Sequence, residues 1–155
     1  MKVIGLITFI LIFSSFVFSQ VAIKQEEVGD IYCDDYLARM DLVRNVLSNE
    51  PTGRIFFLIY EGKERIYNAK KEKNEIVFPA YGSAKARISS MKQRFLLFNE
   101  KHLLERIVFI KAGFRENFML ETWFVPLEAE PPKSTPTLTK MRYRKGAPKA
   151  FCVGM

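Results

Sequence analysis

One stretch, from Gly82 to Val125, constrains the fold more than any other part of this sequence. It begins with Gly82-Ser83, a helix start, and continues with apolar residues at helical spacing, namely Ala84, Ile88, Met91, Phe95 and Phe98. The apolar run 106–110 follows, then Gly113, then a second candidate strand from 118 to 125. Apolar positions three and four apart mark one face of a helix, whereas short apolar runs bounded by turn residues mark strands. The stretch predicts an amphipathic helix laid on a sheet, followed by a hairpin that turns at Gly113.

A matching helix and strand are expected upstream. Asp34 or Asp35 is a suitable N-cap, and apolar residues follow at helical spacing, namely Tyr36, Met40, Val43 and Leu47. Pro51 stops this helix, because proline cannot continue it and disfavours helical geometry in the residue before it. The next run, 55–60, is apolar at every position, which is typical of a central strand covered on both faces.

Two segments are less regular. Residues 21–29 are consistent with a short edge strand. In residues 61–80, the charged segment 70–75 separates Ile66-Tyr67 from the apolar residues 76–78, which fits either a protruding hairpin or a mobile loop.

These elements follow the order (β)αβαββ, which predicts an α+β two-layer sandwich with two helices on one face of a small mixed sheet. The helical crossover between 55–60 and 106–110 favours a right-handed parallel pairing of these two strands. The chain has 155 residues, of which 48% are hydrophobic, so one folded domain is expected, over residues 20–126.

The N-terminus resembles a cleavable secretory signal. Met1-Lys2 is a short positive region, Val3 to Phe13 is apolar, and Val17 and Ser19 occupy the −3 and −1 positions of a cleavage site. Residues 1–19 are therefore predicted to be a signal peptide, which makes the mature protein secreted or periplasmic. The alternative is an uncleaved membrane anchor, although the apolar run is short for a span of ~20 residues. No later segment is expected to cross a membrane.

Export gives the two cysteines, Cys33 and Cys152, a specific interpretation. An oxidising compartment favours a disulfide between them, which would close most of the mature chain into one loop and contribute about 4–5 kcal/mol in the chain-entropy model. The alternative is free or intermolecular thiols. Two cysteines and a single histidine do not indicate a zinc site, and no metal or cofactor is inferred.

The C-terminal residues, 127–155, are predicted to lie outside the domain. Residues 128–136 are rich in proline and predict an extended linker, after which Tyr143 and Phe151 lie among lysines and arginines in a basic tail. The net charge of +7 favours anionic partners. For an exported protein, this means an anionic envelope surface rather than nucleic acid.

Several passages resemble a group of uncharacterised secreted bacterial proteins, namely residues 33–41, 57–60, 86–87 with Lys92, 106–108, 113–116 and 121–126. The order of elements over residues 26–126 is similar to the OmpA-type C-terminal, peptidoglycan-associated domain. The resemblance implies a wall-binding site in which an arginine early in the second helix holds a carboxylate of a cell-wall peptide, and Arg87 stands at that position. In that domain an aspartate after the preceding strand holds the amine. This chain has Tyr60-Glu61-Gly62 there, followed by an insertion over 62–80.

The position of Arg87 in the sequence also supports a ligand-binding role, independently of the resemblance. A guanidinium near a helix N-terminus adds to the positive end of the helix dipole and can hold a carboxylate in a two-bond fork. The alternative is an exposed arginine on a polar helix face. The predicted ligand-binding residues are Arg87, Glu61 and Lys85. The adjacent Arg115 and Glu116 are predicted to form a salt bridge in the turn after Gly113.

Catalytic motifs are not evident. The sequence contains no nucleophile elbow, phosphate-binding loop or zinc-protease helix, and His102, beside Leu103-Leu104, is expected to be partly buried or to cap a helix. The predicted function is a secreted, non-catalytic, envelope-associated binding or structural module that binds peptidoglycan or another anionic wall polymer. The alternative is a protein-interaction module that uses the proline-rich and basic C-terminal segment.

Overall fold

The computed structural model describes residues 20–68, 70–148 and 152, and the predicted signal peptide lies outside them. The described residues form a mixed α+β fold with three helices and five strands. The helices are α2 (Cys33–Asn49), α3 (Ser83–Leu97) and α4 (Lys101–Leu104). The strands are β1 (Ile23–Val28), β2 (Arg54–Asn68), β3 (Lys73–Val77), β4 (Ile107–Asn117) and β5 (Met119–Val125). No helix of the described residues is long and apolar enough to cross a membrane.

The sheet is built around β2, which pairs with β4 on one side and with β5 on the other. β2 and β4 are parallel, with Ile55 opposite Ile107 and Leu58 opposite Ile110, and this confirms the pairing predicted from the helical crossover. β5 is antiparallel to β2, and β1 is antiparallel to β5, so residues 23–28 form the edge strand that the sequence allowed.

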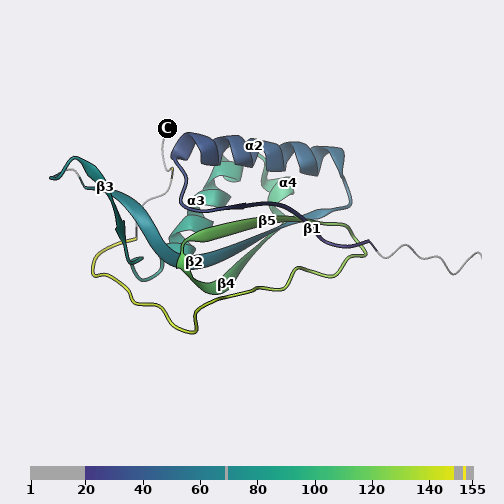
Figure 1. Ribbon diagram of the computed structural model, residues 1–155. Coiled ribbons are helices and arrows are strands. Elements are labelled where there is room, and N and C mark those ends of the chain that lie inside the picture. The colour runs from purple at the N-terminus through teal and green to yellow at the C-terminus, as the bar shows by residue number, and fades with distance from the viewer. Residues whose placement is uncertain (1–19, 69, 149–151, 153–155) are drawn as a thin grey trace, which may run out of the picture.

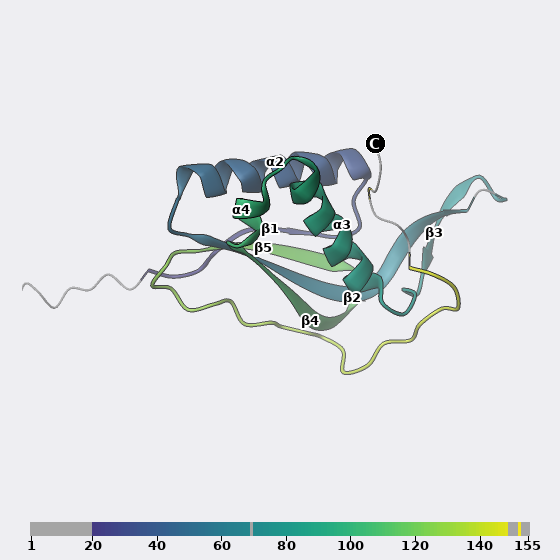
Figure 2. The ribbon, with the colours of Figure 1, turned by 180° about the vertical axis from the view of Figure 1, so that it is seen from behind.

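The helices lie on the same side of this sheet (Figures 1 and 2). The main core lies between them and the sheet, and α2 contributes the four side chains expected from its spacing, namely Tyr36, Met40, Val43 and Leu47. α3 buries Ala84, Met91 and Phe95, with Ile88 packed against the core. The prediction for Phe98 is wrong, because it lies beyond the end of α3 and is 49% exposed.

The uninterrupted apolar run of β2 faces two separate clusters. Ile55, Phe57 and Ile59 join the core under the helices. Phe56, Leu58 and Tyr60 lie on the opposite face, where partly buried side chains from before β1 and after β5, Ala22 and Ala129, pack against them. The run is therefore covered on both faces as predicted, but extended chain covers the second face.

The C-terminal segment, defined here as residues 126–148, is extended and runs along the sheet face that the helices leave open (Figure 1). The backbone N–H groups of Thr137 and Leu138 donate to the carbonyl oxygen of Phe114, at 2.9 and 3.1 Å. Further along, the N–H of Arg144 donates to the carbonyl oxygen of Pro79 at 3.0 Å. The residues that the sequence assigns to a linker and a tail are thus bound along the domain.

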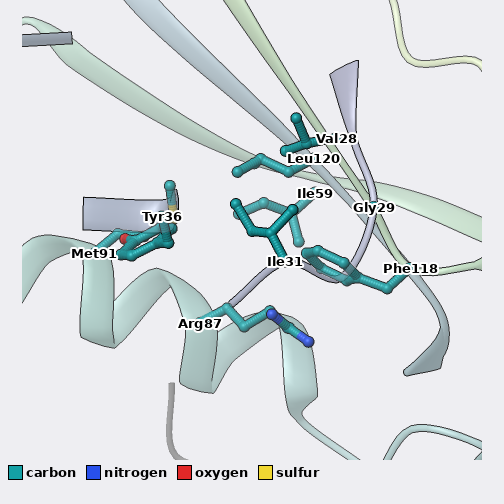
Figure 3. A pocket seen from close by; sticks show the side chains of 9 residues that line it. All are labelled: Val28, Gly29, Ile31, Tyr36, Ile59, Arg87, Met91, Phe118 and Leu120. Atoms are coloured by element: carbon teal, nitrogen blue, oxygen red, sulfur yellow. The ribbon is translucent and has the colours of Figure 1, made fainter. Parts of the chain in front are cut away.

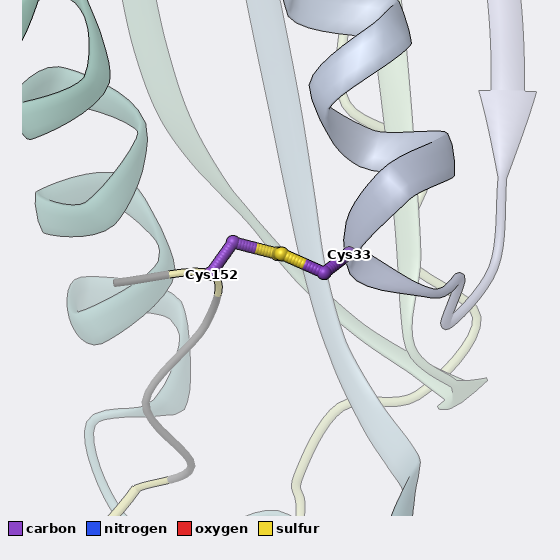
Figure 4. The surroundings of a disulfide bond; sticks show 2 residues. All are labelled: Cys33 and Cys152. Carbon is purple, nitrogen blue, oxygen red and sulfur yellow. A yellow bond between two sulfur atoms is a disulfide. The ribbon is translucent and has the colours of Figure 1, made fainter. Parts of the chain in front are cut away.

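A disulfide joins Cys33 at the start of α2 to Cys152, and the two Cα atoms are 5.5 Å apart (Figure 4). This is the pairing predicted from the sequence. The bond holds Cys152 beside the helices.

Of the two alternatives for residues 61–80, the structure shows the protruding hairpin. β2 continues to Asn68 and pairs antiparallel with β3, from Glu64 opposite Val77 to Asn68 opposite Lys73, and the hairpin extends beyond the helices at one end of the molecule (Figure 1).

The predicted hairpin of 106–110 and 118–125 is wrong, because β4 and β5 lie on opposite sides of β2 and do not pair with each other. Gly113 does not form the predicted turn either. It lies inside β4, with a φ of 101°, where the register of the β2–β4 pair shifts. The chain reverses four residues later, between Asn117 and Met119, and Gly113 serves as a bulge.

Candidate functional site

A cleft of about 460 Å³ opens where the parallel strands end and α3 begins. The side chains that give it its chemistry are Glu61, Tyr81, Lys85, Lys111, Phe114 and Tyr143. Open sheets commonly bind ligands at the carboxyl ends of parallel strands, where the chain leaves one strand and enters a helix. The volume is in the range of small-molecule sites. This cleft is the candidate functional site.

Glu61 lines the cleft from β2. No side chain of α3 itself caps this helix, and no acidic residue occupies its first turn. Glu61 reaches across from β2 instead, and its Oε1 accepts a hydrogen bond of 2.9 Å from the N–H of Ala84. It therefore satisfies one of the N–H groups that a helix N-terminus leaves without an internal partner.

The second oxygen of Glu61 holds the C-terminal segment. Oε2 accepts a hydrogen bond of 2.6 Å from the hydroxyl of Tyr143. Burial, and then this bond to a carboxylate, raise the pKa of Tyr143 to about 12. Glu61 was predicted to bind a ligand, and it lines the cleft, but both of its oxygens accept hydrogen bonds from the protein itself.

Lys85 and Lys111 supply the available positive charge. Both side chains are exposed at the cleft, one from the first turn of α3 and the other from β4. Neither ammonium group forms an ion pair with another described residue. A lysine in the first turn of a helix adds to the positive end of the dipole and gains nothing from it. The predicted residue Lys85 thus lies where an anion would be attracted, and Lys111 joins it.

Arg87 does not lie in this cleft. Its side chain is 4% exposed, so the alternative of an exposed arginine on a polar face is wrong. Its Nη2 is 3.0 Å from Oδ1 of Asp30 and 3.3 Å from Oε2 of Glu64, and the guanidinium lies 3.7 Å from the centre of the Phe118 ring. The fork that the sequence offers to a ligand is directed at carboxylates of the protein.

The space beside Arg87 is too small for a ligand (Figure 3). Figure 3 shows the side chain running from α3 toward Phe118, among apolar side chains such as Ile31 and Leu120. The cavity there is about 10 Å³, which is at the lower limit for one water molecule.

Glu64 links this interior cluster to the C-terminal segment. It is 2% exposed, and its Oε1 is 3.6 Å from Nη2 of Arg144. One buried carboxylate is therefore compensated by an arginine from α3 and another from the C-terminal segment.

A second charged cluster lies on the other face of the sheet, around Glu121. This carboxylate is 2% exposed and accepts hydrogen bonds from Arg115 at 2.7 Å, Trp123 at 3.0 Å and Lys24 at 3.1 Å. Burial would raise the pKa of Glu121, but the bonds from Trp123, Lys24 and Arg115 outweigh it and hold the pKa below its ordinary value.

The predicted pair Arg115–Glu116 is wrong. Arg115 pairs with Glu121 and also with Glu27 at 3.0 Å, and Glu116 pairs with Lys63 at 3.3 Å. Neighbours in a strand point to opposite faces of the sheet, so two adjacent strand residues find different partners.

His102 is exposed on α4, so the expectation of a partly buried or capping histidine is not met. No three His, Cys, Asp or Glu side chains among the described residues are grouped so as to hold a metal ion.

Four of the six side chains that give the cleft its chemistry were not among the predicted site residues, namely Tyr81, Lys111, Phe114 and Tyr143. Tyr81 stands directly before the helix start at Gly82. Residues that connect a strand to a helix often line clefts, so its position in the sequence is a usable signal. Tyr143 comes from the C-terminal segment, and no local pattern predicts its return to the domain.

No protein family model, curated protein or solved structure matches this chain.

Proposed function

We propose that this protein is an exported, non-catalytic binding module of the cell envelope, whose cleft binds an anionic wall polymer such as peptidoglycan. The observation that carries the proposal is the pair of exposed lysines, Lys85 and Lys111, at the opening of a 460 Å³ cleft and without ion-pair partners among the described residues. The net charge of +7 acts in the same direction, because it attracts polyanions over a longer range.

Export is supported by two independent features. Residues 1–19 have the charge, apolar run and small residues of a cleavable signal peptide. The Cys33–Cys152 disulfide is of the kind that persists in oxidising compartments. Both features favour the periplasm or the exterior of the cell.

Kinship with the OmpA-type domain is also proposed, from the order of elements around the parallel β2–β4 pair. The proposed binding residues differ from those that the resemblance implies. Arg87 is buried against Asp30 and Glu64, whereas Lys85 and Lys111 are exposed at the cleft.

The side chains that line the cleft support a binding role. Among the described residues that line it, there is no serine, cysteine, histidine or aspartate. Its carboxylate, Glu61, is bonded to Ala84 and Tyr143. The lining can attract and orient an anion, but it offers no activated nucleophile.

The alternative suggested by the sequence, a protein-interaction module based on the C-terminal segment, has weaker support. Two of the segment's distinctive side chains, Tyr143 and Arg144, contact Glu61 and Glu64 of the domain. They are therefore less available to a partner than a free tail would be.

Sedimentation with purified peptidoglycan tests the proposal. The double variant Lys85→Ala/Lys111→Ala is expected to bind about tenfold more weakly, and its binding is expected to depend less on salt. The matched control is Lys101→Ala/Lys140→Ala, which removes the same charge from exposed positions outside the cleft. Equal losses of peptidoglycan binding in the two double variants would show that only the net charge of the protein matters. That result would refute the cleft as the binding site.

A further inference from the structure

The most exposed large apolar side chain at the cleft is Tyr81, with 81% of its surface in contact with solvent. It stands immediately before α3, in the turn that ends at Gly82. An exposed tyrosine ring leaves a large apolar area in water. A ring at the opening of a charged cleft suits a ligand that carries a flat apolar face next to its charge.

Tyr143 holds a fixed position beside this ring. The two ring centres are 5.5 Å apart and the ring planes meet at 76°, an edge-to-face contact. The hydroxyl of Tyr143 is anchored to Glu61 at 2.6 Å. The pair therefore forms a corner of two aromatic surfaces, and the Tyr143 side of it is held by the hydrogen bond to Glu61.

The charges around this corner leave a surplus of positive charge. The negative charge of Glu61 is met by the N–H of Ala84 and the hydroxyl of Tyr143. Lys85 and Lys111 have no such compensation. A ligand that brings a carboxylate to the lysines and a ring face to Tyr81 uses both features at once.

The type of cation and the arrangement of the rings favour a sugar over a nucleobase. Lysine is a point donor that serves carboxylate and hydroxyl oxygens, whereas phosphate recognition and base stacking favour the planar fork of arginine. No arginine lines the cleft among the described residues. Two rings close to perpendicular offer one face and one edge, which does not suit a base sandwiched between parallel rings.

We propose that the cleft binds an acidic sugar of a polysaccharide, with the sugar ring on Tyr81 and its carboxylate between Lys85 and Lys111. This inference rests on the proposed function of the cleft and specifies the chemical group that it takes. The polarised C–H groups on one face of a sugar ring lie against the negative face of the tyrosine ring. The cleft volume of 460 Å³ suits a short piece of the polysaccharide, either within the polymer chain or at its end.

Calorimetric titration with four soluble probes tests the proposal. The probes are oligogalacturonate, its neutral methyl ester, oligoglutamate and oligothymidylate. We expect oligogalacturonate to bind most tightly, the methyl ester to bind about tenfold more weakly because it lacks the charge, and oligoglutamate to bind about tenfold more weakly because it lacks the ring. Equal or tighter binding of oligoglutamate or oligothymidylate would overturn the proposal, as would a failure of oligogalacturonate to bind.

Two variants separate the ring from the charge. Tyr81→Ala is expected to weaken oligogalacturonate binding about tenfold and to leave oligoglutamate binding unchanged. The matched control is Tyr67→Ala, on the β2–β3 hairpin, which removes a tyrosine that is 63% exposed. Equal effects of the two substitutions would refute the role of Tyr81. Because both tyrosines are exposed, neither change should prevent folding.

The inference and the proposed function fail in different ways. If Lys85→Ala/Lys111→Ala leaves peptidoglycan binding intact, the proposed function of the cleft is refuted. If that variant loses binding but Tyr81→Ala does not, the cleft is an anion site and the acidic-sugar assignment alone is refuted.

Discussion

Glu64 and Glu121 are each 2% exposed, and each is compensated by two cations that come from other elements of the fold. A buried charge that loses its partner is more costly than a surface charge, because no water replaces the lost interaction. Substitutions at these two carboxylates or at their partners should therefore have large effects on stability.

Arg87→Ala is expected to lower the free energy of unfolding by about 3–5 kcal/mol, because Glu64 would lose its nearest cation in the interior. Urea denaturation followed by circular dichroism measures the change. The control Arg142→Ala removes an exposed arginine and should cost less than about 1 kcal/mol. Arg87→Lys keeps the charge but loses the fork, and should fall between the two. If Arg87→Ala were fully stable and lost wall binding, Arg87 would be a ligand residue after all.

Glu121→Gln is expected to destabilise the protein by about 3 kcal/mol near neutral pH, and the effect should shrink in acid. The pKa of Glu121 in the folded state lies below its ordinary value of 4.5, so the unfolded chain takes up the proton first as the pH falls. Stability from this carboxylate is therefore complete above that ordinary value and is lost as the pH falls through the folded pKa. Urea denaturation of both proteins between about pH 7 and pH 3 measures the gap.

The control for that experiment is Glu116→Gln. Glu116 pairs with Lys63, its side chain is 74% exposed, and the substitution should cost no more than about 1 kcal/mol at any pH. A gap between Glu121→Gln and the natural protein that stays constant across the pH range would contradict the stabilised carboxylate.

At this scale the sequence predicted part of the site. Glu61 and Lys85 line the cleft, whereas Arg87 does not. The reason is helical phase. Arg87 stands three residues after Ala84 and four before Met91, within the apolar stripe of α3, so its side chain points inward. Lys85 and Arg87 are two residues apart, about 200° around the helix, and cannot serve the same cleft.

Among the elements, the β2–β4 pair leaves no room for a side chain at Gly62. A Cβ added at Gly62 would lie 2.1 Å from the carbonyl carbon of Asn117, which is backbone and cannot rotate away. Gly62→Ala should therefore destabilise the protein by about 3 kcal/mol or more. The control Gly29→Ala meets nothing nearer than 3.7 Å and should stay within about 1 kcal/mol. Thermal unfolding compares them, and equal midpoints would show that the strands separate more easily than described.

The helices and central strands were predictable from the spacing of apolar residues. The chain segments that cover the sheet face opposite the helices were harder to predict. The spacing of Tyr36, Met40, Val43 and Leu47 specifies the buried face of α2, and the continuous run 55–60 specifies burial on both faces. The cover of the second face comes from extended chain, which has no periodicity to detect. Gly113 was expected to turn the chain because glycine serves turns and bulges alike, and sequence does not separate the two.

For the whole molecule, the disulfide and the C-terminal segment act together. The bond joins residues separated by 119 positions. Cys33→Ser/Cys152→Ser is therefore expected to lower the free energy of unfolding by about 2–5 kcal/mol, chiefly because the unfolded chain gains freedom. Denaturation with and without dithiothreitol measures this.

The reductant provides the control for that prediction. It should bring the natural protein to the stability of the double variant and leave the double variant unchanged. Equal stability of the two proteins without reductant would show that the bond contributes nothing.

The bond between Cys33 and Cys152 also changes how the molecule would respond to proteases. Trypsin has exposed lysines to attack in the tip of the hairpin, such as Lys71, and in the C-terminal segment, such as Lys133. A single cut at either place lies inside the covalent ring, so the two fragments would stay joined and migrate as one species on a non-reducing gel. Only a reducing gel would separate them, and a non-reducing gel alone would be a misleading measure of proteolytic resistance.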